Sequence, residues 1–229
     1  MLVKSKAIFL KQIKYGEGSF IIKLFTQAHG LETYFANSIK SKQSALKPSY
    51  LMPLSILDIV YDMKITSNFQ RLKECRTYTF MHQIHSETLK SSIAIFAQEL
   101  LFKCLPEKEA NDELFEEIEI FVYYLENTQN SLANLPLTFM LKISKIIGFA
   151  YHTAYAEENF GSAAITIPEE NVSSALHFLE NTSYDACHEL KIDKQKRDLL
   201  MQKLNRWYEM HVPGYSQINS TFILSQIFQ

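Results

Sequence analysis

The spacing of apolar residues changes near Tyr78, and this change constrains the fold more than any other feature of the chain. Before it, apolar and polar residues alternate in short runs, a pattern typical of β-strands. After it, apolar residues recur every three or four positions, a pattern typical of amphipathic helices. The sequence therefore predicts a multi-domain α and β fold, with a β domain at residues 1–78 and an all-α helical domain at residues 79–229.

The β domain contains five runs with strand character, at residues 5–14, 19–26, 31–38, 53–62 and 65–76. Gly16, Gly18 and Gly30 lie in the turns between the first three runs, where glycine adopts backbone angles that other residues avoid. Residues 39–48 have the composition of a flexible basic loop. Five short strands joined by tight turns and one long loop are typical of a small closed barrel of the OB type.

The second part predicts helices at residues 78–104, 111–127, 136–148, 169–180, 193–211 and 221–228. Asn111 or Asp112 can cap the second of these helices. On that helix Glu116, Glu117 and Glu119 are expected to form a solvated face. Residues 150–166 have no clear period and are expected to be irregular.

Charge divides at almost the same point as the apolar pattern. Residues 1–80 contain twelve Lys and Arg against five Asp and Glu, whereas residues 81–229 contain eleven against twenty. The net charge of −2 conceals this division. A positive field over a compact domain attracts polyanions, and nucleic acid is the commonest large polyanion. The β domain is therefore expected to bind nucleic acid, and the acidic domain to contact other partners.

The candidate DNA-binding residues are Lys6, Lys11, Lys14, Lys23, Tyr34, Lys40, Lys42, Lys47, Arg71, Lys73 and Arg76. Lysine suits contact with phosphates without readout of bases. The three lysines of the long loop, Lys40, Lys42 and Lys47, are the strongest individual candidates. Tyr34 and Phe35 are adjacent on one strand, so only one of them can face the core. An exposed Tyr34 or Tyr15 would offer a face on which bases stack.

Several classes of protein are not supported by the sequence. No apolar run approaches the ~18–20 residues of a membrane span, and the N-terminus lacks the apolar stretch of a signal peptide. The three cysteines, Cys75, Cys104 and Cys187, are odd in number and far apart, which is unlike a disulfide framework. No nucleophile or phosphate-loop motif is present. We expect a cytoplasmic protein with reduced thiols and no catalytic residues.

Two segments match a known pattern. The N-terminal matches are Lys6-Ala7-Ile8-Phe9-Leu10, Tyr15-Gly16-Glu17, Ile21-Ile22, Leu24-Phe25-Thr26 and Gly30-Leu31, followed by the basic segment at residues 36–42 and by Pro53. The C-terminal matches are Trp207-Tyr208, His211, Gly214, Ser220 and Leu224. In this combination the chain resembles the bacterial RecO family of recombination mediators, in order of elements over nearly its whole length.

The resemblance implies an N-terminal OB barrel and a C-terminal helical domain. It also implies binding of single- and double-stranded DNA, annealing of complementary strands, and loading of recombinase together with RecR and the single-strand-binding protein. The tail of the latter would enter an apolar groove of the helical domain and pair its carboxylate with a cation. Lys103, Lys142, Lys145 and Arg206 are candidates for this cation by residue type alone.

The chain departs from the family in one respect. Many members carry a four-cysteine zinc site in the region corresponding to residues 150–175. Residues 151–175 of this chain contain no cysteine. The sequence therefore predicts that the zinc site is lost, that no cofactor is bound, and that packing holds this region instead.

Two other functions remain open from the residues alone. The barrel could be a non-catalytic scaffold that binds protein or oligosaccharide, with its lysines serving solubility. The irregular stretch at residues 150–166 could hold an unrecognised active site. Steeply salt-dependent DNA binding would exclude the scaffold, and an active site would show a concave pocket with shifted ionisable groups.

Overall fold

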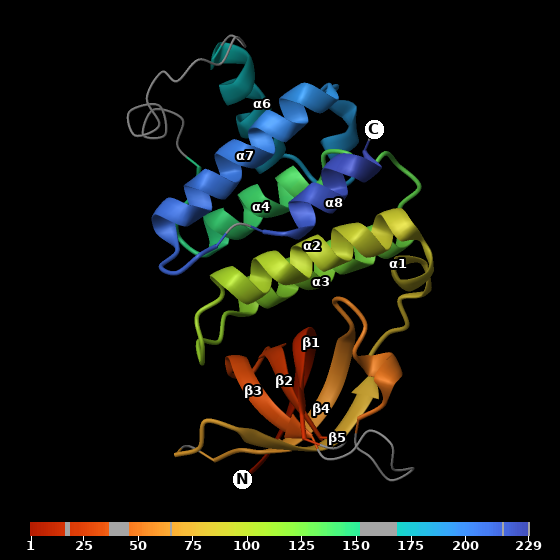
Figure 1. Ribbon diagram of the computed structural model, residues 1–229, viewed down its shortest axis with the longest axis vertical. Coiled ribbons are helices and arrows are strands. Elements are labelled where there is room, and N and C mark those ends of the chain that lie inside the picture. The colour runs from red at the N-terminus through yellow and green to blue at the C-terminus, as the bar shows by residue number, and fades with distance from the viewer. Residues whose placement is uncertain (17–18, 37–45, 65, 152–168, 217, 229) are drawn as a thin grey trace. The chain divides into compact units, whose positions relative to one another are not determined.

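Five strands close into a barrel with the order β1-β2-β3-β5-β4 (Figure 1). They are β1 (Leu2–Tyr15), β2 (Ser19–Thr26), β3 (Gly30–Ala36), β4 (Ile56–Asp62) and β5 (Gln70–Thr77). All neighbours pair antiparallel except β3 and β5, which pair in parallel. The computed structural model describes residues 1–229 apart from 17–18, 37–45, 65, 152–168, 217 and 229. The expected OB-type barrel followed by a helical region is confirmed.

Alternate residues of each strand fill the inside of the barrel, as the two-residue period of a strand requires. This interior contains Ala7, Phe9, Ile22, Leu24, Tyr34, Ala36, Leu57, Ile59, Tyr61, Leu72 and Cys75. The pairing of β1 with β2 shifts between Phe9 and Lys11, and the pairing of β4 with β5 shifts between Val60 and Tyr61. Such irregularities bend strands and increase their twist, which a small closed barrel needs.

One part of the outer barrel surface is also apolar, and helices cover it. Ile8, Leu10 and Phe25 are buried although they do not belong to the interior cluster. The ring of Phe25 stacks on that of Phe115 with 5.9 Å between centroids. The covering helices are α1 (His82–Ser86), α2 (Thr88–Cys104) and α3 (Asp112–Asn127). The Gln98 side chain joins α2 to the barrel, because its amide donates to the carbonyl of Leu10.

The loop between α2 and α3 approaches the start of β3 very closely. The backbone N–H of Lys108 donates to the carbonyl of Leu31 at 2.9 Å. Gly30 has a φ of +71°, and a Cβ at this position would lie 2.0 Å from the backbone oxygen of Glu109. Glycine is therefore required here both for its backbone angle and for its lack of a side chain.

The remaining helices form a second apolar core. They are α4 (Leu135–Ile146), α6 (Glu169–Asn181), α7 (Lys194–His211) and α8 (Ser220–Ile227), with short 3₁₀ turns at Pro48–Tyr50 in the barrel and Cys187–Glu189 here. Trp207 of α7 donates its indole N–H to the carbonyl of Phe149 at 2.9 Å, and the hydroxyl of Tyr208 donates to that of Met140 at 2.8 Å. Among the helices of the described residues, none is long and apolar enough to cross a membrane.

The chain divides into two compact units, Met1–Val122 and Tyr123–Gln229. The change of apolar period predicts the boundary at 78/79 instead. The structure groups α1, α2 and most of α3 with the barrel, because these helices bury its outer apolar residues. It also breaks the helix expected at residues 78–104 at Glu87, whose backbone is extended.

Candidate nucleic-acid interface

Three of the candidate lysines contact α2, α3 or the loop between these helices, within their own unit. Lys6 pairs with Glu119 of α3 at 3.0 Å, and its Nζ lies 4.3 Å from the ring centroid of Tyr78. Lys11 lies 4.4 Å above the ring of Phe102 on α2. The ion pair of Lys6 with Glu119 competes with its expected role as a phosphate ligand, whereas Lys11 is still exposed.

Lys23 is the third of these lysines and pairs with Glu107 of the α2–α3 loop. Its side chain is only 19% exposed. The pairing of Lys6 corrects a second expectation, because Glu119 lies 15% exposed against that lysine and is not part of a solvated face. Desolvation is the largest single influence on the pKa of Lys6 and lowers it, but the hydrogen bonds and charge interactions with Glu119 and Tyr78 together outweigh it, so the pKa is raised and the lysine stays charged. The contacts of Lys6, Lys11 and Lys23 fasten the helices to the barrel.

The other candidate cations of the described residues are exposed. They are Lys14, Lys47, Arg71, Lys73 and Arg76. Arg76 lies 3.7 Å from Glu74, and both side chains are well exposed, so water screens this pair strongly. Lys47 lies 5.9 Å from the ring centroid of Tyr50. Lys40 and Lys42, two of the three strongest candidates, lie outside the described residues.

Tyr34 is the aromatic candidate that the structure contradicts. Its side chain is fully buried, and its hydroxyl donates to Glu32 at 3.0 Å. Burial raises its pKa well above the ordinary value. Its ring packs edge-on against that of Tyr61, 5.1 Å away. A base has no access to this ring, so Tyr34 is a core residue.

The exposed aromatic surface lies on the other side of the same strand. Because side chains alternate along β3, burial of Tyr34 directs Phe35 outward. Phe35 packs edge-on against Tyr15, with centroids 6.0 Å apart, and Tyr15 is 58% exposed. Phe35 is also the residue opposite Ile21 on β2 and Arg71 on β5. These side chains therefore meet across three adjacent strands.

Together they line a shallow groove of about 570 Å³ on the barrel surface. The lining residues are Tyr15, Ile21, Phe35, Phe69, Gln70 and Arg71. Phe69 is 50% exposed, and the sequence pattern does not indicate it, because it stands alone in the turn before β5. The neighbouring residue Gln70 fixes the shape of this turn, because its side-chain amide accepts a hydrogen bond from the N–H of Lys64 and donates one to the carbonyl of Lys64.

The groove joins aromatic faces to a guanidinium. Aromatic rings bind unpaired bases by stacking, and arginine contacts phosphate through two N–H groups in a fixed geometry. Exposed apolar and aromatic side chains of this kind are unusual on a surface without a ligand or partner. The arrangement is therefore suited to a single strand of nucleic acid.

Comparison with known proteins agrees with the geometry. Residues 1–80 match the model of the recombination protein O N-terminal region, and residues 85–155 match that of its C-terminal region. The DNA repair protein RecO of Flavobacterium psychrophilum is 31% identical over the full length of both chains. The chain belongs to the RecO family. RecO proteins of Flavobacterium johnsoniae and Christiangramia forsetii are 30% and 28% identical, also over full length.

Membership of the RecO family makes this a DNA repair protein. It also directs attention to a second groove, of about 450 Å³, between α7 and α8. Arg206 lines it beside Glu209, with which it pairs at 3.1 Å, and Phe222 on α8 is 70% exposed at its rim. Met201 also lines it.

The other candidate cations for a partner's carboxylate lie elsewhere. Lys103 pairs with Glu99 at 3.1 Å, and Lys142 lies 5.2 Å from the ring centroid of Tyr184. Lys145 is exposed near the end of α4. Of the four, Arg206 is the one that the structure places in the α7–α8 groove.

The region where the sequence comparison places a four-cysteine zinc site offers no cysteine ligand in this chain. Residues 151–175 supply no thiolate, and no group of three or more metal-binding side chains gathers among the residues with described coordinates. The three cysteines are free and buried in separate places. Burial raises the pKa of Cys75 and of Cys104 to about 12, which disfavours the thiolate form that metals bind. Most of residues 150–166, the site expected for an alternative enzyme, lie outside the described residues.

Proposed function

We propose that the barrel binds single-stranded DNA through the groove of Phe35 and Phe69, with Arg71 and its neighbouring exposed cations on the phosphates. The observation that carries this proposal is an exposed aromatic groove beside a guanidinium on the barrel of a RecO-family protein. Stacking favours unpaired bases, and phosphate contacts serve single and double strands alike. The protein therefore binds both forms and prefers single strands.

Binding two complementary strands on one protein reduces their mutual repulsion, which promotes annealing. In this proposal the protein has no catalytic step, works in the cytoplasm, and helps to load recombinase together with RecR. It functions without zinc or another cofactor. The α7–α8 groove takes the acidic, apolar tail of single-strand-binding protein, with Phe222 as the apolar contact and Arg206 as the cation.

The decisive experiment is a titration of fluorescein-labelled oligo(dT) by fluorescence anisotropy across a series of salt concentrations. The binding constant K falls as salt rises, so the plot of log K against log salt has a negative slope. For single strands, each lost phosphate contact makes this slope less steep by about 0.7. If both residues contact phosphate, Arg71/Lys73→Ala should make this slope less steep by about 1.4. The matched variant Lys11/Lys23→Ala removes the same charge from residues that face helices, and should leave the slope unchanged.

Each variant is first checked for an unfolding transition close to that of the wild type. A Lys40/Lys42/Lys47→Ala variant tests the long loop in the same way. A wild-type slope near zero, or no binding, would contradict the proposal and favour the scaffold. Equal slopes for Arg71/Lys73→Ala and wild type would show that the protein contacts phosphates at a site other than this groove.

A further inference from the structure

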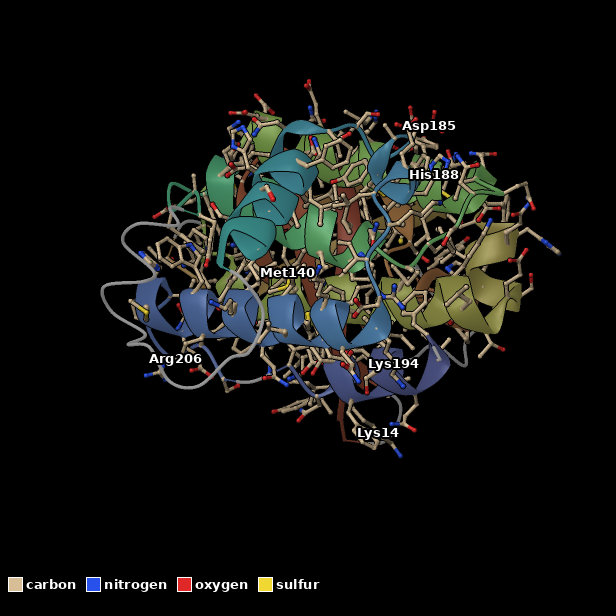
Figure 2. The ribbon with its side chains drawn as sticks, turned by 90° about the horizontal axis from the view of Figure 1, so that it is seen from above. Lys14, Met140, Asp185, His188, Lys194 and Arg206 are labelled. Carbon is tan, nitrogen blue, oxygen red and sulfur yellow. The ribbon has the colours of Figure 1, made fainter. Side chains whose placement is uncertain are left out.

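The positive charge of the acidic part of the chain is concentrated in one place. Residues 191–206 contain six basic and two acidic residues, whereas the rest of residues 81–229 contains five basic and eighteen acidic. The six are Lys191, Lys194, Lys196, Arg197, Lys203 and Arg206, called here the α7 cations. Five of them lie on α7 itself, and Figure 2 shows Lys194 and Arg206 toward its two ends.

Intramolecular contacts account for only part of this charge. Arg197 donates to the carbonyl of Ile192, and Arg206 pairs with Glu209. Lys191 reaches the carbonyl of His188 at 3.3 Å. For Lys194, Lys196 and Lys203, by contrast, the described residues provide no ion pair.

Helix stability does not explain the cations either. The first turn of α7 contains no acidic residue, although Asp193 caps it by accepting from the N–H of Lys196 at 2.8 Å. The N-terminal end of a helix carries a partial positive charge, so each cation there is unfavourable by about 0.3–1 kcal/mol at low salt. The positions of Lys194, Lys196 and Arg197 therefore work against the helix.

The charges also sort by side of the helix. With 3.6 residues per turn, Lys196 and Lys203 share one flank, and neither lines the groove with α8. Asp198 and Glu209 do line that groove. The most exposed apolar residues of this unit, Phe222 and Ile223, belong to α8. Met210, seven residues beyond Lys203, shares this flank and is 38% exposed. The flank of Lys196 and Lys203 thus combines two cations with less exposed apolar surface than α8 offers for peptide docking.

We infer that the flank of α7 with Lys196 and Lys203 forms a second DNA-binding surface, which takes the phosphate backbone of a strand other than the one on the barrel. Lys196 and Lys203 are seven residues apart, which is about 10 Å along the helix. Successive phosphates of one strand in B-DNA rise about 3.4 Å, so this length spans roughly three of them. The inference rests on the proposed DNA binding of the barrel and adds a site in the other unit.

The test is the same salt series with the variant Lys196/Lys203→Gln of the full chain. With a labelled DNA duplex, its slope should fall by about 1.8, since each contact contributes about 0.9. The matched control Lys108/Lys145→Gln removes equal charge from two exposed positions and should bind as the wild type does. Native mass spectrometry with a non-complementary oligonucleotide should find two strands per wild-type chain, and one per chain in either the Lys196/Lys203 or the Arg71/Lys73 variant.

The outcomes separate this inference from the proposed function. If Arg71/Lys73→Ala weakens binding while Lys196/Lys203→Gln matches its control in slope and in number of strands, the barrel site stands and the α7 site is refuted. If no variant and no wild-type protein binds, both fall. If Lys196/Lys203→Gln loses a labelled Glu-rich peptide but keeps both strands, α7 docks an acidic protein segment and the DNA inference is wrong.

Discussion

Single residues decide how the barrel joins its helices, and Gly30 is the clearest case. It needs a left-handed backbone angle and leaves no room for a Cβ beside Glu109. Gly16 has a similar φ of +61° but open space around it. Comparing alanine variants of Gly30 and Gly16 therefore separates the stability lost through the left-handed backbone angle from the stability lost through the steric clash.

We expect Gly30→Ala to lower the free energy of unfolding by at least about 3 kcal/mol, because a clash adds to the ~1–2 kcal/mol of a left-handed alanine. Gly16→Ala should cost only the smaller amount. Urea denaturation of both variants measures the difference. Equal losses would mean that the loop at Glu109 does not lie against Gly30.

The thiols provide a second test at this scale. The pKa of Cys75 and of Cys104 is about 12 in the folded protein, against about 8.5 in an unfolded chain. The neutral thiol is thus favoured by folding, and this contribution is complete below about pH 8.5 and is lost as the pH rises toward 12. At pH 8 we expect all three cysteines to resist a thiol reagent in native protein and to react in urea. Fast native labelling would contradict the described burial.

At the scale of elements, alternation along β3 determines what a ligand can reach. The strand buries Tyr34 and leaves Phe35 partly exposed on its outer face, and the β4–β5 turn adds Phe69 beside it. Tyr15, Phe35 and Phe69 thereby form one aromatic surface on the outside of the barrel. Lysines of the same sheet that lie nearer the helices are engaged with Phe102, Glu107 or Glu119.

We expect Phe35→Ala and Phe69→Ala each to weaken single-strand binding by about 1–3 kcal/mol, the value of one lost stacking contact. Duplex binding should change less, because paired bases do not offer their faces. Anisotropy titrations with both forms measure this selectivity. Phe222→Ala, an equally bulky exposed phenylalanine of α8, serves as the control. An equal loss for duplex and single strand would mean that these rings do not stack on bases.

For the whole molecule, the boundary between the units is open to a direct test. The structure groups residues 1–122 as one unit, whereas the apolar period changes near residue 78. A barrel cut at residue 78 would expose Ile8, Leu10 and Phe25, each stabilised by about 1.5–3 kcal/mol when buried. We therefore expect the helices to belong to the folding unit of the barrel.

We expect a fragment of residues 1–127, which ends with α3, to unfold cooperatively in urea and to bind oligo(dT). A fragment of residues 1–78 should be insoluble or lack a cooperative transition. Circular dichroism and fluorescence through the transition compare the two. Cooperative unfolding of the shorter fragment would restore the boundary at 78/79.

The sequence alone determined the order of elements, the barrel and the family, because strand and helix periods and turn residues are local properties. It also narrowed the surface aromatic at residues 34–35 to one of two neighbours, but the choice of Phe35 depends on strand register, which pairing across the sheet decides. Which lysines are free was likewise a tertiary outcome. Lys6, Lys11 and Lys23 look like Arg71 and Lys73 in sequence, and only the packing of α2, α3 and their loop against the barrel brings the first three into contact with Glu119, Phe102 and Glu107.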